Sequence, residues 1–477
     1  MYCQLEALRH CLPPSLRRIL DELPETLDET YERVLKDINK ANREHARRLL
    51  QCLAVASRPL RVEELAEVLA IDFAAPANGG IPQLNPNWRW TDHHQAVLST
   101  CSSLITIVSD GDFQVVQFSH FSVKEFLTSD RLARSGRDVY RYHISLEPAH
   151  TILAQACLGV LLRLDDCVDR QNSSGIPLVG YASQHLFDHA GFGKVTSHIR
   201  VAMEYFFDAD KPHWTAWSQV QKMDGWWWPW FTPRGGWDAA LPLYFTSLGG
   251  FYDLAEHLVS KHPEHINARG GQMVTPLFAA LHRKHFRIAE LLHRHGADVT
   301  VRGWLNITLL HAACVAGIVD IVQWLLNHGA DVNTKSDDGS VPISGAVARG
   351  HLQVVRMLIA FNADIGVRRD FGRGLLHVAA SRHKNDDHVG VMQLLLDRGA
   401  NPNARCDDGS TPLHHSSWWG EEDFGPVWGS VEGTRLLLKY GAIIDAEDNE
   451  GRTPLQLALD NDRQDIVACL REHGATR

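Results

Sequence analysis

Histidine and cysteine are the residue types in this sequence best suited to bind a metal or to act as nucleophiles. The chain has 27 histidines and nine cysteines. No two cysteines form a CxxC pair, and neither an HExxH motif nor a Cys/His finger spacing occurs. Several histidines stand instead at equivalent places of a repeated block or just before a glycine: His311, His377, His414, His295, His328 and His473. The pattern predicts structural histidines and no metal site.

Motifs for nucleophilic catalysis and for phosphate binding are also missing. No GxSxG element occurs, and no segment matches the phosphate loop GxxxxGK[ST], whose backbone amides and lysine hold a nucleotide. The nearest segment, at 191–194, has Asp188 where the first loop glycine belongs. We therefore expect a protein that is not an enzyme, with no catalytic residue and no cofactor.

Composition narrows the class of partner and the compartment. The formal net charge of −10 offers no concentrated basic surface, so we expect no nucleic-acid partner. The most apolar stretch, Thr151 to Leu164, is too short to span a bilayer, so we expect no membrane partner. An odd number of unpaired cysteines and the lack of a signal peptide predict a cytoplasmic protein, with the nucleus as the alternative.

The C-terminal half repeats itself with a period of 33 residues. Blocks such as TPLFAALHRK, TLLHAACVAG, TPLHHSSWWG and TPLQLALDND begin at 275, 308, 411 and 453. In these blocks Thr caps a short helix, and in three of the four Pro follows it and suits the first turn. A second apolar helix then ends at a glycine in the left-handed conformation. Those glycines stand at 296, 329, 399, 441 and 474, with Asn362 in the equivalent place of one repeat. The blocks closely resemble ankyrin repeats over residues 239–477.

The array departs from a regular repeat in two ways. The first repeat, which begins near Leu241, is degenerate and ends in KHPEHIN instead of a Gly-Ala pair, so we expect it to act as an N-terminal cap. Two later repeats are longer, near His383–His388 and Glu421–Ser430. We expect these additions to form loops, which on a rigid scaffold often carry recognition.

The residues before the repeats predict three helices followed by a two-stranded wing. Helices are expected near Glu44–Ala56, within 59–71 and over Gln95–Cys101. Strands are expected at 104–108 and 113–119, separated by SDGD. This is the order of a winged-helix domain.

Two segments of this region carry a further resemblance. LPETLDETYERVL at 23–35 and FSHFSVKEFLTSD at 118–130, together with the repeats, resemble fungal NACHT–ankyrin proteins, which are STAND-type signalling NTPases. The resemblance covers residues 13–130 and continues more weakly over 140–210. Because this sequence has no phosphate loop, it represents either a product that lost its NACHT core or a part of a longer protein.

His120 is the sharpest candidate for chemistry that the resemblance implies. In relatives, a histidine in the FxHxS context contacts the phosphates of bound ADP, and Phe118, His120 and Ser122 match that context. His120 would then report the nucleotide state of a NACHT core supplied by another chain. The simpler interpretation is that His120 caps the helix that begins near Ser122, and we favour it because this chain has no phosphate loop.

Two further alternatives concern surfaces. A winged helix can bind DNA, but the third helix, HHQAVLSTCSS, has no Lys or Arg to reach phosphates and bases. A tryptophan-rich junction contains Trp214, Trp217, Trp226, Trp227, Trp228, Trp230 and Trp237. We favour a hydrophobic plug between the linker and the first repeat over a membrane or partner patch, since no basic amphipathic helix accompanies it.

The resemblance to ankyrin repeats places partner binding on the turn tips and on the exposed ends of the inner helices. The expected protein-binding residues are Asp337, Asp338, Arg349, Asp370, Arg373, Arg382, Asp407, Asp408, Trp418, Trp419, Asn449 and Arg452. Trp418 and Trp419 either face the concave groove as anchors or pack against the lengthened loop with Phe424 and Trp428; both readings stay open.

The predicted fold is mainly α. It comprises a helical segment that follows a NACHT-type core (1–42), a winged-helix domain (43–135), a helical linker with the Trp-rich junction (136–238) and an ankyrin-repeat α-solenoid of about seven repeats (239–477). The expected function is a protein-binding scaffold or sensor module of a STAND-type signalling protein. The alternative is a C-terminal regulatory fragment of a NACHT nucleoside triphosphatase. A NACHT-containing chain is a second expected partner.

Overall fold

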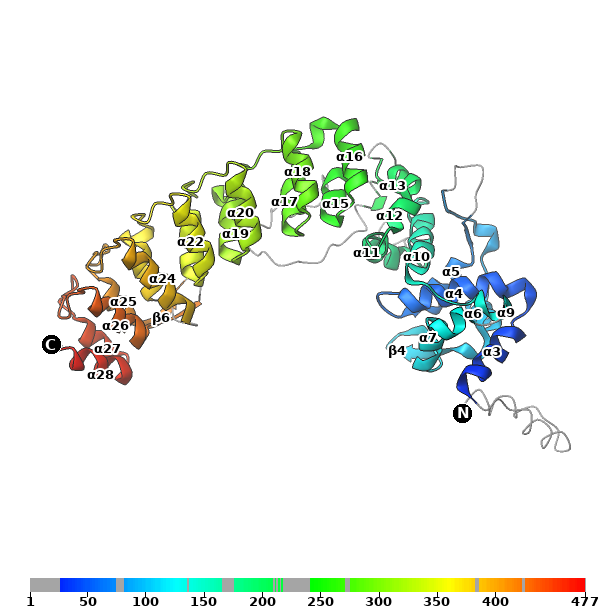
Figure 1. Cartoon of the computed structure of the whole chain (residues 1–477), viewed down its shortest axis with the longest axis horizontal. Helices are drawn as coiled ribbons and strands as arrows, with labels where there is room; N and C mark the ends of the chain where they lie inside the picture. Colours follow the sequence, from blue (N-terminus) through cyan, green and yellow to red (C-terminus); the bar gives the residue numbers. More distant parts are fainter. Residues whose placement is uncertain are drawn as a thin grey trace. The chain divides into compact units, whose positions relative to one another are not determined.

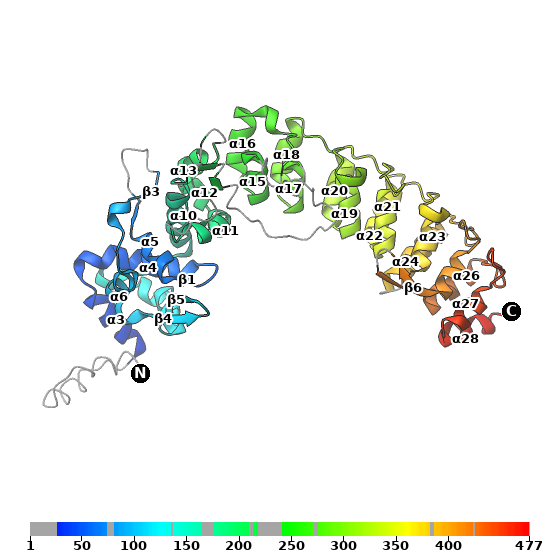
Figure 2. The same ribbon diagram turned by 180° about the vertical axis from the view of Figure 1, so that it is seen from behind.

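The computed structural model describes eleven stretches of the chain (Figure 1, and from behind in Figure 2). They are residues 26–73, 81–134, 137–164, 176–208, 211, 213–214, 216–217, 241–270, 275–381, 386–422 and 425–476. The described residues through 270 form one compact unit, and those from 275 onward form a second. The degenerate first repeat therefore belongs to the compact unit of the linker.

The first unit begins with the predicted winged helix. Its helices and strands are α3 (Leu27–Asp37), η2 (Lys40–Asn42), α4 (Arg43–Val55), β1 (Leu60–Arg61), α5 (Val62–Val68), β2 (Ile71–Asp72), β3 (Gln83–Leu84), η4 (Pro86–Trp88), α6 (His93–Cys101), η5 (Ser102–Leu104), β4 (Ile105–Asp110), β5 (Phe113–Phe118), α7 (Phe121–Leu127), α8 (Asp130–Ala133) and α9 (Arg137–Tyr140). The three helices and the β4–β5 wing confirm the expected order. A third strand, β1, pairs antiparallel with β5, so the sheet order is β1-β5-β4. A strand of two residues has no periodicity that a sequence pattern can reveal.

The helical linker follows within the same unit. It consists of α10 (Leu146–Leu161), α11 (Val179–Ala190), α12 (Val195–His198) and α13 (Arg200–Phe206). The central helix α10 packs against both α4 and α11, which explains why it is apolar on more than one face. Among the helices that the structure describes, none has the length and apolar character that crossing a membrane requires.

An aromatic cluster joins the linker to the first helix pair, α15 (Pro242–Gly249) and α16 (Tyr252–Lys261), which is followed by η7 (Pro263–His265). Trp217 is fully buried, with its ring 4.9 Å from that of Phe245 and 5.4 Å from that of Phe206. Trp214 lies 5.1 Å from Trp217. These contacts support the plug for the two tryptophans described; Trp226, Trp227, Trp228, Trp230 and Trp237 lie outside the described residues.

The second unit is a stack of six helix pairs, which runs from green to red in Figure 1. The pairs are α17 (Pro276–His282) with α18 (Phe286–Arg294), α19 (Leu309–Ala316) with α20 (Val319–Asn327), α21 (Pro342–Arg349) with α22 (Leu352–Ala360), α23 (Leu375–Ala380) with α24 (Asp386–Asp397), α25 (Pro412–Ser417) with α26 (Val431–Lys439), and α27 (Pro454–Asp460) with α28 (Gln464–Glu472). The short turns η8 (Trp304–Asn306) and η9 (Asp370–Gly372) precede α19 and α23. From α19 onward each helix packs on the equivalent helix of the next pair, as the repeat predicts.

The expected helix ends are confirmed. The five predicted glycines all have positive φ, for example 88° at Gly329, and Asn362 has φ 65°. At the start of α17, Thr275 Oγ1 accepts a hydrogen bond from the Phe278 amide at 3.3 Å, as predicted for the Thr cap.

Both lengthened repeats differ from the predicted loops. Residues 386–388 are the first turn of α24, so that part of the predicted loop is wrong. In the next repeat a two-stranded hairpin follows α25, with β6 (Trp419–Glu422) antiparallel to β7 (Gly425–Trp428). The inserted segment forms a hairpin because its two ends pair as antiparallel strands. Amino-acid composition alone does not predict such pairing.

Candidate protein-binding surface

Each turn that leads from one repeat into the next inner helix is stabilised from within; we call these turns fingers. In the finger at 336–340, the Asp338 carboxylate accepts hydrogen bonds from the Ser336 hydroxyl at 2.5 Å and the Ser340 amide at 3.1 Å. Partial burial raises the pKa of Asp338, but these hydrogen bonds outweigh it and leave the pKa below its usual value. The carboxylate of Asp338 therefore holds its own finger in shape.

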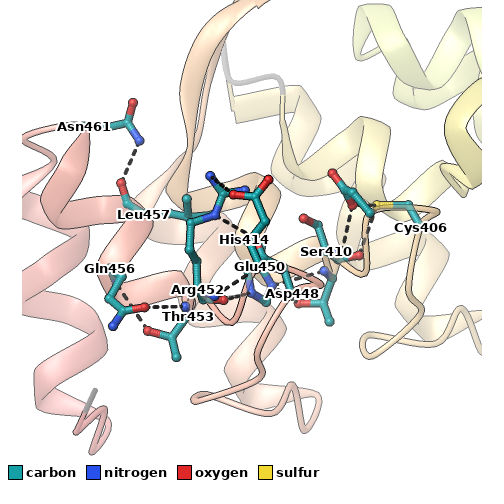
Figure 3. A network of polar contacts seen from close by, with 12 residues as sticks. Cys406, Ser410, His414, Asp448, Glu450, Arg452, Thr453, Gln456, Leu457 and Asn461 are labelled. Carbon is teal, nitrogen blue, oxygen red and sulfur yellow. Dashed lines mark hydrogen bonds and ion pairs between the residues drawn. The ribbon is translucent and has the colours of Figure 1, made fainter.

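The finger at 406–410 has the same construction. Asp408 accepts from the Cys406 thiol at 2.9 Å and from the Ser410 amide at 2.9 Å. Although desolvation acts against it, the pKa of Asp408 falls to about 2 through these hydrogen bonds. In the finger at 448–452, the buried Asp448 accepts from the Arg452 amide at 2.8 Å and from its guanidinium at 2.9 Å (Figure 3).

Backbone hydrogen bonds connect one finger to the next. The amide of Asp337 donates to the Leu305 carbonyl at 3.0 Å, and the amide of Asp407 donates to the Phe371 carbonyl at 2.9 Å. The amide of Asn449 donates to the carbonyl of Asp408 at 2.9 Å. The finger tips are therefore held in a fixed register, which lowers the entropy cost of binding a partner across several tips.

Histidines of the inner helices support the fingers from beneath. Nδ1 of His414 accepts from the Thr411 amide at 3.1 Å, while Nε2 donates to the Arg452 carbonyl in the next finger at 3.1 Å (Figure 3). His311 and His377 bond to the Ser340 and Ser410 carbonyls in the same way, at 3.2 Å each. Burial lowers the pKa of all three histidines, so the neutral form is favoured.

The predicted binding residues divide into two groups by what their side chains contact. Asp337, Arg349, Asp407 and Asn449 are exposed and remain candidates for contact with a partner, although Asp337 accepts from the Asn306 side chain and Asn449 Nδ2 donates to the Asp407 carbonyl at 3.0 Å. Asp338, Asp408 and Arg452 are exposed in part but also hold their own fingers. Arg373 lies with its guanidinium carbon 5.5 Å from the centre of the Phe371 ring. Asp370 belongs to η9, but its side chain and the whole of Arg382 lie outside what the structure describes.

The tryptophan pair is not placed as predicted. The inner helix α25 ends at Ser417, so Trp418 is its half-buried C-cap in extended conformation, and Trp419 begins strand β6 opposite Trp428. The prediction that both belong to the inner helix is wrong. The pairing of β6 with β7 concerns the backbone, and a role of Trp418 and Trp419 in partner binding stays a prediction.

Two residues that the sequence analysis missed stand at the tips of fingers. Leu305 and Phe371 are exposed and have positive φ, 56° and 62°. They occupy the place, three residues before the helix-capping position, that Asp338 and Asp408 occupy in other fingers. An alignment of the repeated blocks shows a bulky apolar residue at these two places, where other repeats have an acid. That difference was the available sequence signal.

Cys406 and His415 are close enough to suggest a nucleophile and its base. The thiol sulfur lies 3.7 Å from Nε2 of His415. Burial raises the pKa of Cys406 to about 12 and lowers the pKa of His415 to about 3. Because a reactive thiolate needs the opposite shifts, this pair is a packed structural contact.

His120 has the capping role that we favoured. It is the N-cap of α7, and its Nδ1 accepts from the Ser122 amide at 3.3 Å. The Ser122 hydroxyl in turn lies 2.8 Å from the hydroxyl of Tyr31 on α3. The histidine thus helps to join two helices of the winged-helix region, and a contact with nucleotide stays a prediction.

Comparison with known proteins agrees with both parts of the fold. Residues 243–336 and 343–424 match the ankyrin-repeat family, and residues 31–136 match the winged-helix domain of GPI inositol-deacylase. The chain therefore contains ankyrin repeats and a winged-helix domain.

Individual proteins are similar to parts of this chain. Azaphilone pigments biosynthesis cluster protein L of Monascus ruber is 28% identical over 57% of this chain and 60% of its own length. An ankyrin repeat protein of Fowlpox virus is 33% identical over 21% of this chain and 28% of its own. Rabankyrin-5 of Mus musculus is 39% identical over 14% of this chain and 5% of its own. This chain thus matches less than two thirds of each of these relatives.

Proposed function

We propose that the ankyrin array binds a protein partner through its fingers and the adjoining ends of its inner helices. The proposal is supported by a difference between two sets of residues: some hold the fingers in shape, and others are exposed on them. The buried histidines and the finger carboxylates keep the tips rigid, whereas Asp337, Arg349 and Asp407 present exposed charges. A surface built in this way suits recognition more than catalysis.

Phe371 is the single observation that carries this proposal. Its side chain is 70% exposed, and its backbone holds φ 62° and ψ 24°. For a bulky residue, both the exposure and the left-handed backbone cost free energy. A strained, exposed aromatic side chain beside Arg373 makes sense as an anchor for a partner, since strain of this kind gathers at functional sites.

For the first unit we propose a regulatory role of the STAND type. The winged helix would pass or restrain the signal that the array receives, with His120 facing nucleotide in a NACHT core, whether from the same protein or from another chain. The match to a winged-helix domain and the resemblance over residues 13–130 support this role. The protein would act in the cytoplasm, or alternatively in the nucleus.

A matched pair of charge reversals tests the binding proposal. Arg349→Glu changes the exposed end of the inner helix α21, and Arg356→Glu changes an exposed position of the outer helix α22. Affinity capture from cells that make the protein should recover a specific partner with the wild type and with Arg356→Glu, but much less with Arg349→Glu. Equal recovery by both variants would contradict a finger-side interface.

A further inference from the structure

A histidine–glutamate–histidine cluster lies where the first, degenerate repeat ends. His262 closes α16, and Glu264 and His265 lie in the following turn η7. Their nearest ligand atoms lie within 4.8 Å of one another. The HPEH segment at 262–265 matches neither HExxH nor a finger spacing, so the motifs of the sequence predict no metal here.

The distances within the cluster resemble one face of a tetrahedral metal site. Nδ1 of His262 lies 3.2 Å from Oε1 of Glu264, and Nε2 of His265 lies 3.7 Å from the same oxygen. Ligands about 2.0–2.1 Å from a zinc ion are roughly 3.3 Å from one another at tetrahedral angles. Both distances to the Glu264 oxygen are close to this spacing, and all three ligand atoms lie within 4.8 Å of one another.

The backbone of this segment is well fixed. The amide of His262 donates to the Leu258 carbonyl at 2.8 Å, and the amide of His265 donates to the His262 carbonyl at 3.0 Å. Pro263 restricts the first residue of the turn, and the buried Ile266 anchors its end. The two imidazole rings are stacked, with centroids 5.0 Å apart. The loss of backbone entropy on binding an ion would therefore be small.

The side chains are also accessible to an ion. The two histidine side chains are 21% and 22% exposed, and Glu264 is 63% exposed. Two imidazoles and one carboxylate form a donor set that suits Zn²⁺ and neighbouring transition metals, and not Ca²⁺ or Mg²⁺, which prefer oxygen ligands.

We propose that His262, Glu264 and His265 bind one zinc-class divalent ion, with water or a partner's side chain as fourth ligand. This repeat lacks the ending of a left-handed Gly, or Asn362 in one repeat, followed by Ala, which closes the other outer helices. The ion would instead tie the C-terminal end of α16 to the turn that follows, and so stabilise the first repeat. The proposal is independent of which protein the array binds.

Cobalt binding to the full chain tests the site directly. Co²⁺ gives tetrahedral visible absorption bands, and its stoichiometry can be counted by equilibrium dialysis against Co²⁺ alone. We compare the wild type with three variants, His262→Gln, His265→Gln and Glu264→Gln. Glu264 is the most exposed of the three residues, so its substitution should disturb the fold least. The control is His328→Gln, because His328 pairs with Glu290 at 3.0 Å and the described residues place no third ligand there.

We expect the wild type and the control to bind one Co²⁺ per chain. Each cluster variant should bind no Co²⁺, or should bind it at least roughly tenfold more weakly. Zn²⁺, unlike Mg²⁺, should also raise the Tm of the wild type and not that of the cluster variants. Circular dichroism establishes that each variant is folded. The same Co²⁺ stoichiometry and affinity in all proteins, or no Co²⁺ bound by the wild type, would overturn the proposal.

Discussion

His414 joins two neighbouring repeats by using both of its ring nitrogens, one for the Thr411 amide and the other for the Arg452 carbonyl. The first contact needs an unprotonated Nδ1, and the second needs a hydrogen on Nε2. The ring is thus held as one neutral tautomer. In the last described repeat Gln456 stands in the equivalent place, and its Oε1 accepts from the Thr453 amide at 3.0 Å (Figure 3).

Removing this ring should destabilise the array. In His414→Ala the Thr411 amide loses its partner, while the Arg452 carbonyl keeps only the bond from the Asp448 amide at 3.0 Å. We expect the free energy of unfolding to fall by about 1–3 kcal/mol. His414→Gln, which can still accept from the Thr411 amide as Gln456 does, should lose less. Urea unfolding of the full chain measures both, with the exposed Lys439→Ala as control. Equal losses in all three variants would show that the repeat-to-repeat bond is unimportant.

Acid should weaken the fold for the same reason. Burial lowers the pKa of His311, His377 and His414, and lowers the pKa of His415 to about 3 and of His189 to about 4. The unfolded chain, with histidine pKa values near 6.5, binds these protons first. Stability is therefore full above about pH 6.5 and falls as the pH drops towards 4, by at most roughly 1.4 kcal/mol per pH unit for His415 and for His189, whose pKa values lie well below 6.5.

Urea midpoints at pH 7.5, 6 and 5 check this dependence. His415→Leu removes one titrating group, so its midpoint should vary less with pH than that of the wild type. A midpoint that is constant or rises on acidification would be inconsistent with neutral buried histidines.

Replacing Phe371 should raise the stability of the fold and weaken partner binding. Phe371→Asn places an asparagine before Gly372, which is the pair that a turn with two positive φ values prefers. We expect a gain of about 1 kcal/mol in the free energy of unfolding, together with weaker partner binding. Asp338→Asn, at the equivalent place of a finger without a positive φ there, should bring no gain. Unchanged partner affinity in Phe371→Asn would refute its role as an anchor.

The aromatic cluster should be essential to the first unit. Trp217→Ala would leave a cavity among Phe206, Trp214 and Phe245, and we expect a loss of about 3–5 kcal/mol. Trp217→Phe keeps most of the packing and should lose clearly less. Thermal unfolding followed by calorimetry gives the values; a Tm for Trp217→Ala equal to that of the wild type would argue against a packed plug.

The repeat period and the capping residues made most of the array predictable, because a 33-residue spacing with Thr and Gly at fixed places restricts the local backbone strongly. Strand β1 and the hairpin of β6 and β7 were missed, since both depend on pairing between segments and not on local pattern. The tips were only partly predictable. The resemblance to ankyrin repeats pointed to the acids of the fingers, but it did not separate Asp337 from Asp338, whose carboxylate holds its own turn although it too is exposed.

Carboxylate footprinting of the array, alone and with its captured partner, tests the central claim most directly. Asp337 and Asp407 are exposed on fingers, while Glu432 and Glu472 are exposed on the outer helices α26 and α28. Labelling with a carbodiimide and an amine, read by mass spectrometry, reports the accessibility of each carboxylate. Our account predicts protection of Asp337 and Asp407 in the complex and unchanged labelling of Glu432 and Glu472. Protection confined to the outer-helix glutamates would contradict it.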